Sequence, residues 1–211
     1  MIDKKFARAL AKQLFSICTQ HDNDIFFIMD SPVRTALRAL IEEHPKEIWT
    51  EASKLLLQND PEVKFRFEHL VECPAENHLG SGLFYYNLPA ELYLDWARKA
   101  PSLRAFIIVK WMQLTLKTTG DELSWHPALQ TFIAEFGAAD HVLDELSARL
   151  CPRSWSGSLV PYLEPLLSLL ETWTSHPLPT VRQWASRQII GLKNWIEQER
   201  RGDEENIIRY R

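Results

Sequence analysis

Apolar side chains recur at intervals of three and four residues along most of this chain, which is the spacing of one face of an α-helix. The first such stripe lies between residues 3 and 20 and consists of Phe6, Leu10, Leu14 and Ile17. This spacing predicts a helix with the stripe as its apolar face. Asp3 lies just before the stripe, where a carboxylate can accept hydrogen bonds from free backbone N–H groups, so we expect it to cap the helix.

Prolines divide the rest of the chain into helical segments. Proline is well tolerated in the first turn of a helix, because an N–H group there has no intrahelical acceptor. The sequence therefore predicts helices that begin at Pro32, Pro45 and Pro61. Further helices are expected over residues 89–99, 102–117, 126–136, 138–150, 161–174 and 178–200. We expect Ser102 to cap its helix and Pro165 to lie in the first turn of its own.

The fold class predicted from this pattern is all-α. No run of alternating Val, Ile or Thr is long enough for a half-buried strand. We expect an irregular stack of about nine or ten antiparallel helices. The chain of 211 residues has the size of one domain, so residues 1–211 are expected to form a single helical-repeat domain. This domain would carry a long loop over about residues 73–88 and a charged C-terminal tail over about residues 201–211.

A short pattern returns along the chain: a proline, a gap of up to one residue, an aliphatic residue, a basic residue, and an apolar residue three positions further on. It consists of Pro32, Val33, Arg34 and Leu37; of Pro61, Val63, Lys64 and Phe67; of Pro101, Leu103, Arg104 and Ile107; and of Pro179, Val181, Arg182 and Ala185. The pattern resembles the start of the second helix of a HEAT repeat, where a proline or aspartate precedes a Val-Arg pair and a small residue follows. The copy at Val181, Arg182 and Ala185 matches best.

The resemblance to HEAT repeats implies an α-solenoid, in which two-helix units bury their apolar faces by stacking on neighbouring units. In this family the arginine of the pattern commonly braces adjacent repeats through an acidic partner. A structural role is therefore implied for Arg34, Arg104 and Arg182. The ending of the chain, over residues 176–205, looks like a terminal HEAT helix that runs into a charged tail. This ending suggests the C-terminal part of a larger bacterial-type multidomain protein.

Charge and cysteine content indicate the environment of the protein. The chain has 24 Lys and Arg against 28 Asp and Glu, a net charge of −4 and no basic cluster, which argues against duplex nucleic acid as a partner. The Leu-rich stretch over residues 159–170 is too short to span a bilayer, so no membrane association is expected. Cys18, Cys73 and Cys151 lie far apart, which suggests no disulfide framework and favours a reducing, cytoplasmic compartment.

The sequence contains no catalytic or metal-binding signature. None of the seven histidines belongs to a His-x-x-x-His arrangement, and no Cys-x-x-Cys pair is present. His44, His126 and His176 each precede a proline and are interpreted as helix-boundary residues. Gly80 and Gly82 flank a serine, but no Gly-Lys-Ser or Gly-Lys-Thr follows them, so a phosphate-binding loop is not expected. We predict no catalytic residue, no cofactor and no metal.

Aromatic residues are the candidates for partner binding. Tyrosine combines a rigid apolar ring with a hydroxyl group, which suits a protein interface. On this ground we single out Phe84, Tyr85, Tyr86 and Trp155 as candidate partner-binding residues. Four tryptophans on apolar stripes are instead expected in the core, namely Trp111, Trp173, Trp184 and Trp195.

Taken together, these patterns favour a non-enzymatic protein-interaction or scaffold module with an unidentified protein partner, because stacked helix pairs form an extended concave surface. One alternative is a HEAT-like DNA alkylation-repair glycosylase, a family of similar length that presents a cationic groove. Another is an oligomerisation or regulatory domain of a larger protein. Its interface would use exposed apolar residues on the first helix, such as Phe15 and Cys18 beside Phe6 and Leu14.

Overall fold

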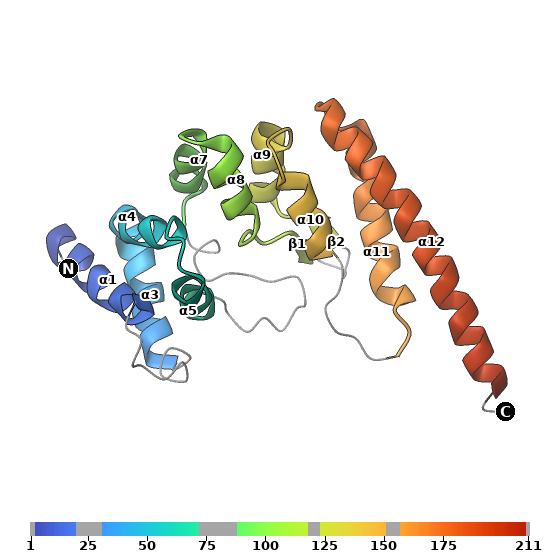
Figure 1. The fold of residues 1–211 in the computed structure, drawn as a ribbon, viewed down its shortest axis with the longest axis horizontal. Coiled ribbons are helices and arrows are strands. Elements are labelled where there is room, and N and C mark those ends of the chain that lie inside the picture. Colours follow the sequence, from blue (N-terminus) through green and yellow to red (C-terminus); the bar gives the residue numbers. More distant parts are fainter. Residues whose placement is uncertain (1–2, 20–30, 72–87, 118–122, 151–156, 210–211) are drawn as a thin grey trace. The chain divides into compact units, whose positions relative to one another are not determined.

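The computed structural model describes residues 3–19, 31–71, 88–117, 123–150 and 157–209. These residues form ten α-helices, two short 3-10 helices and one two-stranded sheet (Figure 1), which confirms the all-α prediction. The chain divides into two compact units. Unit 1 comprises Met1–Lys99 with Trp111–Gln113, and unit 2 comprises Ala100–Lys110 with Leu114–Arg211. The expectation of one domain over residues 1–211 stays a prediction.

Unit 1 is built from helices that begin close to where the prolines predicted them. Its elements are α1 (Lys4–Ser16), η1 (Ile17–Thr19), α3 (Ser31–Glu43), α4 (Pro45–Leu56), α5 (Pro61–Val71) and α7 (Ala90–Arg98). The cap predicted at Asp3 is confirmed, because its Oδ1 accepts a hydrogen bond from the backbone N–H of Phe6 at 2.8 Å. The residues predicted as the long loop lie outside the described residues, apart from the buried Leu88.

The apolar face predicted for α1 is wrong. The buried residues of this first segment are Ala7, Ala11, Phe15 and Cys18, whereas Phe6 is 57% exposed and Leu10 and Leu14 are half-buried. The buried stripe is shifted by one residue from the predicted one, and it begins with two alanines. Small side chains let the backbone of α1 approach α4, against which it packs. The ring of Phe15 then meets Phe67 of α5 at 5.9 Å between centroids.

A buried carboxylate joins α1 to α4. Glu51 of α4 is 7% exposed, and its Oε1 accepts a hydrogen bond from Nε of Arg8 on α1 at 2.7 Å. Its other oxygen accepts a hydrogen bond from Nζ of Lys54 at 2.5 Å. Burial raises the pKa of the Glu51 carboxyl, but these two hydrogen bonds and the two positive charges outweigh burial and hold the pKa below its usual 4.5. The ionised form is therefore the one that stabilises unit 1.

Replacing Glu51 by Gln is expected to lower the free energy of unfolding near neutral pH by about 1–2 kcal/mol, because the amide loses two charge-assisted hydrogen bonds. The loss stays modest because Arg8 and Lys54 are 55% and 57% exposed and remain solvated. The lowered pKa means that this contribution is present above pH 4.5 and is lost as the pH falls through the pKa of the folded state. Urea unfolding followed by circular dichroism should show the two proteins converging in acid. Equal stability near neutral pH would contradict the assignment.

Unit 2 contains a sheet that the sequence pattern did not predict. Its elements are α8 (Pro101–Val109), β1 (Thr115–Lys117), β2 (Leu123–Trp125), α9 (Pro127–Phe136), α10 (Val142–Leu150), α11 (Val160–Glu171), η2 (Thr172–Ser175) and α12 (Pro179–Arg209). The helix predicted over residues 102–117 ends at Val109, and the strands pair antiparallel with Thr115 opposite Trp125. Ser102 is not the cap, because Ala100 holds that position before Pro101.

The core of unit 2 holds three tryptophans in contact. Trp125 of the hairpin stacks on Trp173 of η2 at 4.1 Å between ring centroids, and Trp173 meets Trp184 of α12 at 5.8 Å. Two of the three indole N–H groups have acceptors: Nε1 of Trp125 donates to the Leu169 carbonyl, and Nε1 of Trp184 donates to Oγ of Ser147. The burial of Trp173 and Trp184, and of Trp111 in unit 1, confirms that they are core residues, whereas Trp195 is half-buried.

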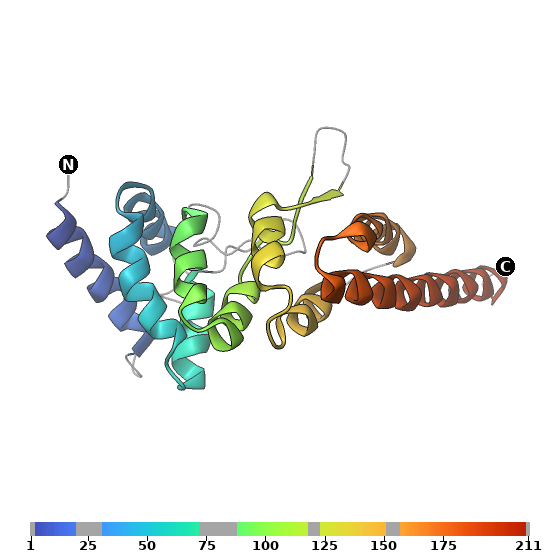
Figure 2. The same cartoon turned by 90° about the horizontal axis from the view of Figure 1, so that it is seen from above.

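Helices α11 and α12 run antiparallel and side by side (Figure 2). Two ion pairs and one hydrogen bond join α12 to α11 and the residue segment before it, and their order along the chain is opposite in the two segments. The ion pairs are Glu171 with Lys193 and Glu164 with Arg200, and the hydrogen bond runs from Ser158 to Asp203. The expectation for Pro165 is wrong, because α11 begins at Val160 and Pro165 lies inside it. Helix α12 continues to Arg209, so most of the predicted charged tail is helical.

Two glycines of unit 2 have opposite surroundings. A Cβ atom on Gly137 would lie 2.6 Å from the Ile133 carbonyl oxygen and 2.7 Å from Cγ2 of Val181. Gly137 therefore allows the end of α9 to approach α12 closely. A Cβ atom on Gly191, which lies inside α12, would have no neighbouring atom within 4 Å.

The variant Gly137→Ala is expected to lower the free energy of unfolding by about 1–3 kcal/mol, because the added methyl group overpacks the contact with Val181. Gly191→Ala is the matched control, and it should raise stability by about 0.5–1 kcal/mol because alanine favours the helix. Urea titration of both variants followed by helical circular dichroism tests the pair. A Gly137→Ala protein at least as stable as wild type would show that α9 and α12 are not in close contact.

Candidate functional site

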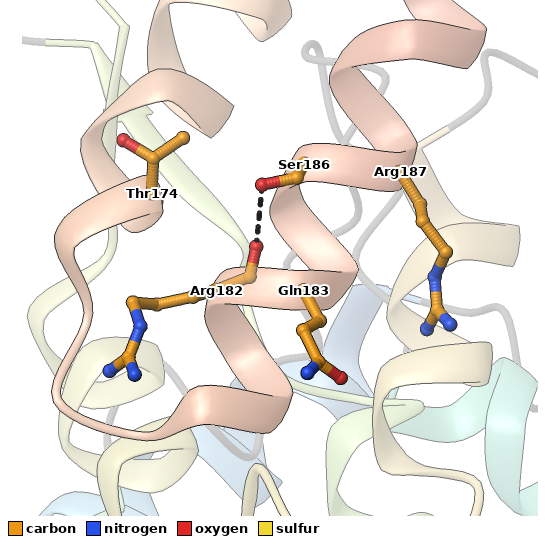
Figure 3. A pocket seen from close by; sticks show the side chains of 5 residues that line it. All are labelled: Thr174, Arg182, Gln183, Ser186 and Arg187. Atoms are coloured by element: carbon orange, nitrogen blue, oxygen red, sulfur yellow. Dashed lines mark hydrogen bonds between the residues drawn. The ribbon is translucent and has the colours of Figure 1, made fainter.

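A shallow groove of about 460 Å³ lies between η2 and the first turns of α12 (Figure 3). It is lined by Thr174, Arg182, Gln183, Ser186 and Arg187. Four of these residues occur at positions i, i+1, i+4 and i+5 of α12, which one side of a helix brings together. Helix η2 ends at Ser175, α12 begins at Pro179, and Thr174 of η2 lines the same groove. We call this feature the α12 groove.

Arg182 is fixed in place at one edge of its guanidinium group. Its Nη1 donates hydrogen bonds to the backbone carbonyls of His176 and Pro177, at 2.8 and 2.9 Å. These carbonyls belong to the turn between η2 and α12, which the arginine thereby braces. The structural role implied for Arg182 is supported, but its partners are carbonyl oxygens rather than a carboxylate. Among the described residues, none accepts a hydrogen bond from its Nε or Nη2.

The other groove residues are all hydrogen-bonding side chains, and no carboxylate lines the groove. The hydroxyl of Ser186 donates to the Arg182 carbonyl at 2.9 Å, and that of Thr174 donates to the Glu171 carbonyl at 2.7 Å. Figure 3 shows the guanidinium groups of Arg182 and Arg187 on either side of Gln183. The positive charges are thus spread along the groove rather than gathered at one point.

The groove lies in a stretch of one charge sign. Residues 172–196 contain Arg182, Arg187 and Lys193 and no Asp or Glu, although the whole chain has a net charge of −4. Lys193 pairs with Glu171 at 3.6 Å. Within the described part of the chain, Arg187 makes no ion pair, and it is exposed. The arrangement therefore offers positive charge and free donors to a ligand that supplies acceptors.

His176 borders this positive region in its neutral form. Its Nδ1 accepts a hydrogen bond from the backbone N–H of Leu178 at 3.1 Å. Burial lowers the pKa of His176, and the charge of Arg182 lowers it further. His126 makes the same contact with the N–H of Ala128, and burial lowers its pKa as well. The interpretation of the three His-Pro junctions as helix boundaries is confirmed, with His44 preceding α4.

The partner-binding residues singled out from the sequence lie outside the described residues. Phe84, Tyr85, Tyr86 and Trp155 therefore stay predictions. Sequence reasoning missed the α12 groove, because it considered clusters of basic residues and not the absence of acidic ones. The stretch over residues 172–196, with three basic residues and no acidic one, was the available signal.

Two buried ionisable groups elsewhere, Cys18 and Tyr93, are held in their neutral forms. Burial raises the pKa of the Cys18 thiol and of the Tyr93 hydroxyl to about 12, so neither is ionised near neutral pH.

Within the described ranges, no three His, Cys, Asp or Glu residues are grouped in a way that would hold a metal ion. The helices described here include none with the length and apolar character needed to cross a membrane.

No protein-family model, curated protein or solved structure matches this chain.

The variant Arg182→Gln should raise the pKa of His176 toward its usual 6.5, because a nearby positive charge is removed. In the wild-type protein the lowered pKa means that stability rises with pH through the window between the folded value and 6.5, and is fully present above 6.5. NMR titration of the imidazole protons measures both pKa values. His126 provides an internal control, since only burial lowers its pKa and it should not respond. An unchanged His176 pKa would show that Arg182 does not act on this ring.

Proposed function

We propose that this protein is a non-enzymatic protein-interaction module built from HEAT-like helix pairs. The observation that carries the proposal is a repeated helix start whose apolar positions have the same burial in both units. Helix α5 of unit 1 begins at Pro61 and buries Val63 and Phe67, which are 4% and 3% exposed. Helix α12 of unit 2 begins at Pro179 and buries the equivalent positions. These are Val181 and Ala185, both 0% exposed.

The other two copies differ in how far they support this proposal. In the first copy, Leu37 of α3 is fully buried, which agrees with the pattern. In the third copy, Leu103 of α8 is 55% exposed, and Ala105 and Ile108 are buried instead. The buried face of α8 therefore differs from the one that the pattern predicts, because a different side of this helix packs against α9 and α10 of unit 2. The proposed array is irregular, with α8 as its exception.

A protein-binding role follows from what such helix pairs leave free. Each pair buries one face against its neighbours, and the outer faces remain available to a partner over several helices. The α12 groove lies on one of these outer faces. Fold resemblance alone does not establish function, so the groove supplies the site on which the proposal can be tested. A cytoplasmic location, and a place within a larger bacterial-type protein, remain part of this proposal.

The two alternative functions have less support. The DNA-repair alternative needs a cationic surface long enough to follow a phosphate backbone, and the α12 groove contributes two arginines on a chain with a net charge of −4. The oligomerisation alternative was placed on Phe15 and Cys18, which are 3% and 1% exposed and therefore cannot form a surface. Phe6 alone of that set is well exposed.

The proposal predicts that the tagged full chain retains a specific protein from its native lysate, and that this protein binds again when purified. The baits to compare are wild type, Arg187→Glu in the α12 groove, and Tyr85→Ala with Tyr86→Ala. Arg201→Glu is the matched control for Arg187→Glu, since it makes the same charge change at an exposed position of α12. Quantitative mass spectrometry should show a partner lost with at least one bait and kept by the control. If no retained protein binds again in purified form, the protein is not an interaction module.

A further inference from the structure

We propose that the α12 groove binds an acidic segment of a partner protein through the carboxylates of that segment. This inference depends on the proposed function and specifies the chemistry of the partner. It concerns the groove lined by Thr174, Arg182, Gln183, Ser186 and Arg187, which lies wholly within unit 2.

The guanidinium group of Arg182 is prepared for a carboxylate. Its Nη1 is held by the carbonyls of His176 and Pro177, which fixes the plane of the group before any ligand arrives. The edge formed by Nε and Nη2 carries two parallel N–H donors, and no described residue accepts from them. Such an edge matches the two oxygens of a carboxylate and can bind them together. Because the side chain is already ordered, a ligand loses less entropy in using it.

The spacing of the donors indicates a segment rather than a single ion. Arg182 and Arg187 are five positions apart on α12, which is about 7.5 Å along the helix axis, and their guanidinium groups lie on either side of Gln183 (Figure 3), so two separate carboxylates suit them better than one small anion. An extended segment with carboxylates at two positions can meet each arginine separately. The amide of Gln183 would lie between them and can donate to a backbone carbonyl.

Charge complementarity selects an acidic partner. The stretch over residues 172–196 is the part of α12 and its preceding turn that has no acidic residue, and Lys193 is already paired with Glu171. Within the described residues Arg187 forms no ion pair, so its charge is available to a ligand. Complementary charges across an interface raise the association rate and favour the correct partner.

An apolar contact adjoins the charged groove. Ile190 is 63% exposed and lies three and four positions after Arg187 and Ser186, so it occupies the same side of α12. The isoleucine would be covered by an aliphatic side chain next to the carboxylates of the partner. The expected segment therefore combines two or more Asp or Glu residues with at least one aliphatic residue.

An array of immobilised peptides tests this inference with the full-length chain. The probes are twelve-residue peptides that carry Asp or Glu and Leu in varied positions, each beside a matched peptide with Asn or Gln in place of the acids. We expect wild-type protein to retain acidic peptides over their amide matches, and to lose them in about 0.5 M salt, where charges are screened within about 3–5 Å. Fluorescence anisotropy then gives the affinity of the best peptide.

Variants locate the binding surface. Arg187→Ala should weaken binding of the best peptide about fivefold, as expected for an exposed charge pair. Arg187→Glu should abolish binding of the best peptide. Arg187→Lys, which keeps the positive charge, should bind this peptide more tightly than Arg187→Ala does. Arg201→Ala, at the far end of the same helix, should leave the affinity unchanged. Circular dichroism of each variant confirms that α12 is folded.

Several outcomes would overturn the inference. Equal retention of acidic and amide peptides, or an affinity that responds to Arg201 and not to Arg187, would exclude carboxylate binding at this groove. Light scattering that shows a dimer lost in Arg187→Glu would identify a second copy of the chain as the occupant. Duplex DNA that displaces the best peptide would identify phosphate instead. A partner captured from lysate by wild type and Arg187→Glu alike would overturn this inference while leaving the interaction module in place.

Discussion

The stacking of Trp125 on Trp173 is the contact on which unit 2 depends. It joins the β1–β2 hairpin to η2, and the approach of Trp173 to Trp184 extends the same core to α12. Large rings bury more apolar area than any aliphatic side chain, and the N–H groups of Trp125 and Trp184 have acceptors, so burying these two rings carries little polar cost. The groove between η2 and α12 exists because this core holds those two elements together.

Helix α12 shows how one periodicity supplies both stability and a surface. Val181, Trp184 and Ala185 face the core, while Gln183 and Arg187 face solvent on the other side of the same turns. Arg182 lies between the two faces. Its guanidinium group satisfies carbonyls that the turn before the helix leaves without partners, and keeps one donor edge for a ligand. A residue expected to be purely structural therefore contributes to the candidate site as well.

Local signals in the sequence were reliable where short-range physics decides the structure. Proline in the first turn located the starts of α4 and α5, and Asp3 caps α1 as expected. Errors arose where distant residues decide. Both stripes of α1 have helical spacing, and the alanine stripe is buried because it allows α4 to approach. The helix expected to reach residue 117 instead ends at Val109, since Trp125 is drawn into the tryptophan core and its strand pairs with β1.

The sequence by itself determined the all-α class, most helix starts and the excess of positive charge over residues 172–196, because propensity, capping and composition are properties of neighbouring residues. Tertiary structure alone decided which stripe of α1 is buried, where the hairpin forms and which donors of Arg182 remain free. These features depend on contacts between residues far apart in the chain, such as the 44 positions that separate Trp125 from Leu169. No local pattern encodes such a contact, because its energy exists only once the helices have packed.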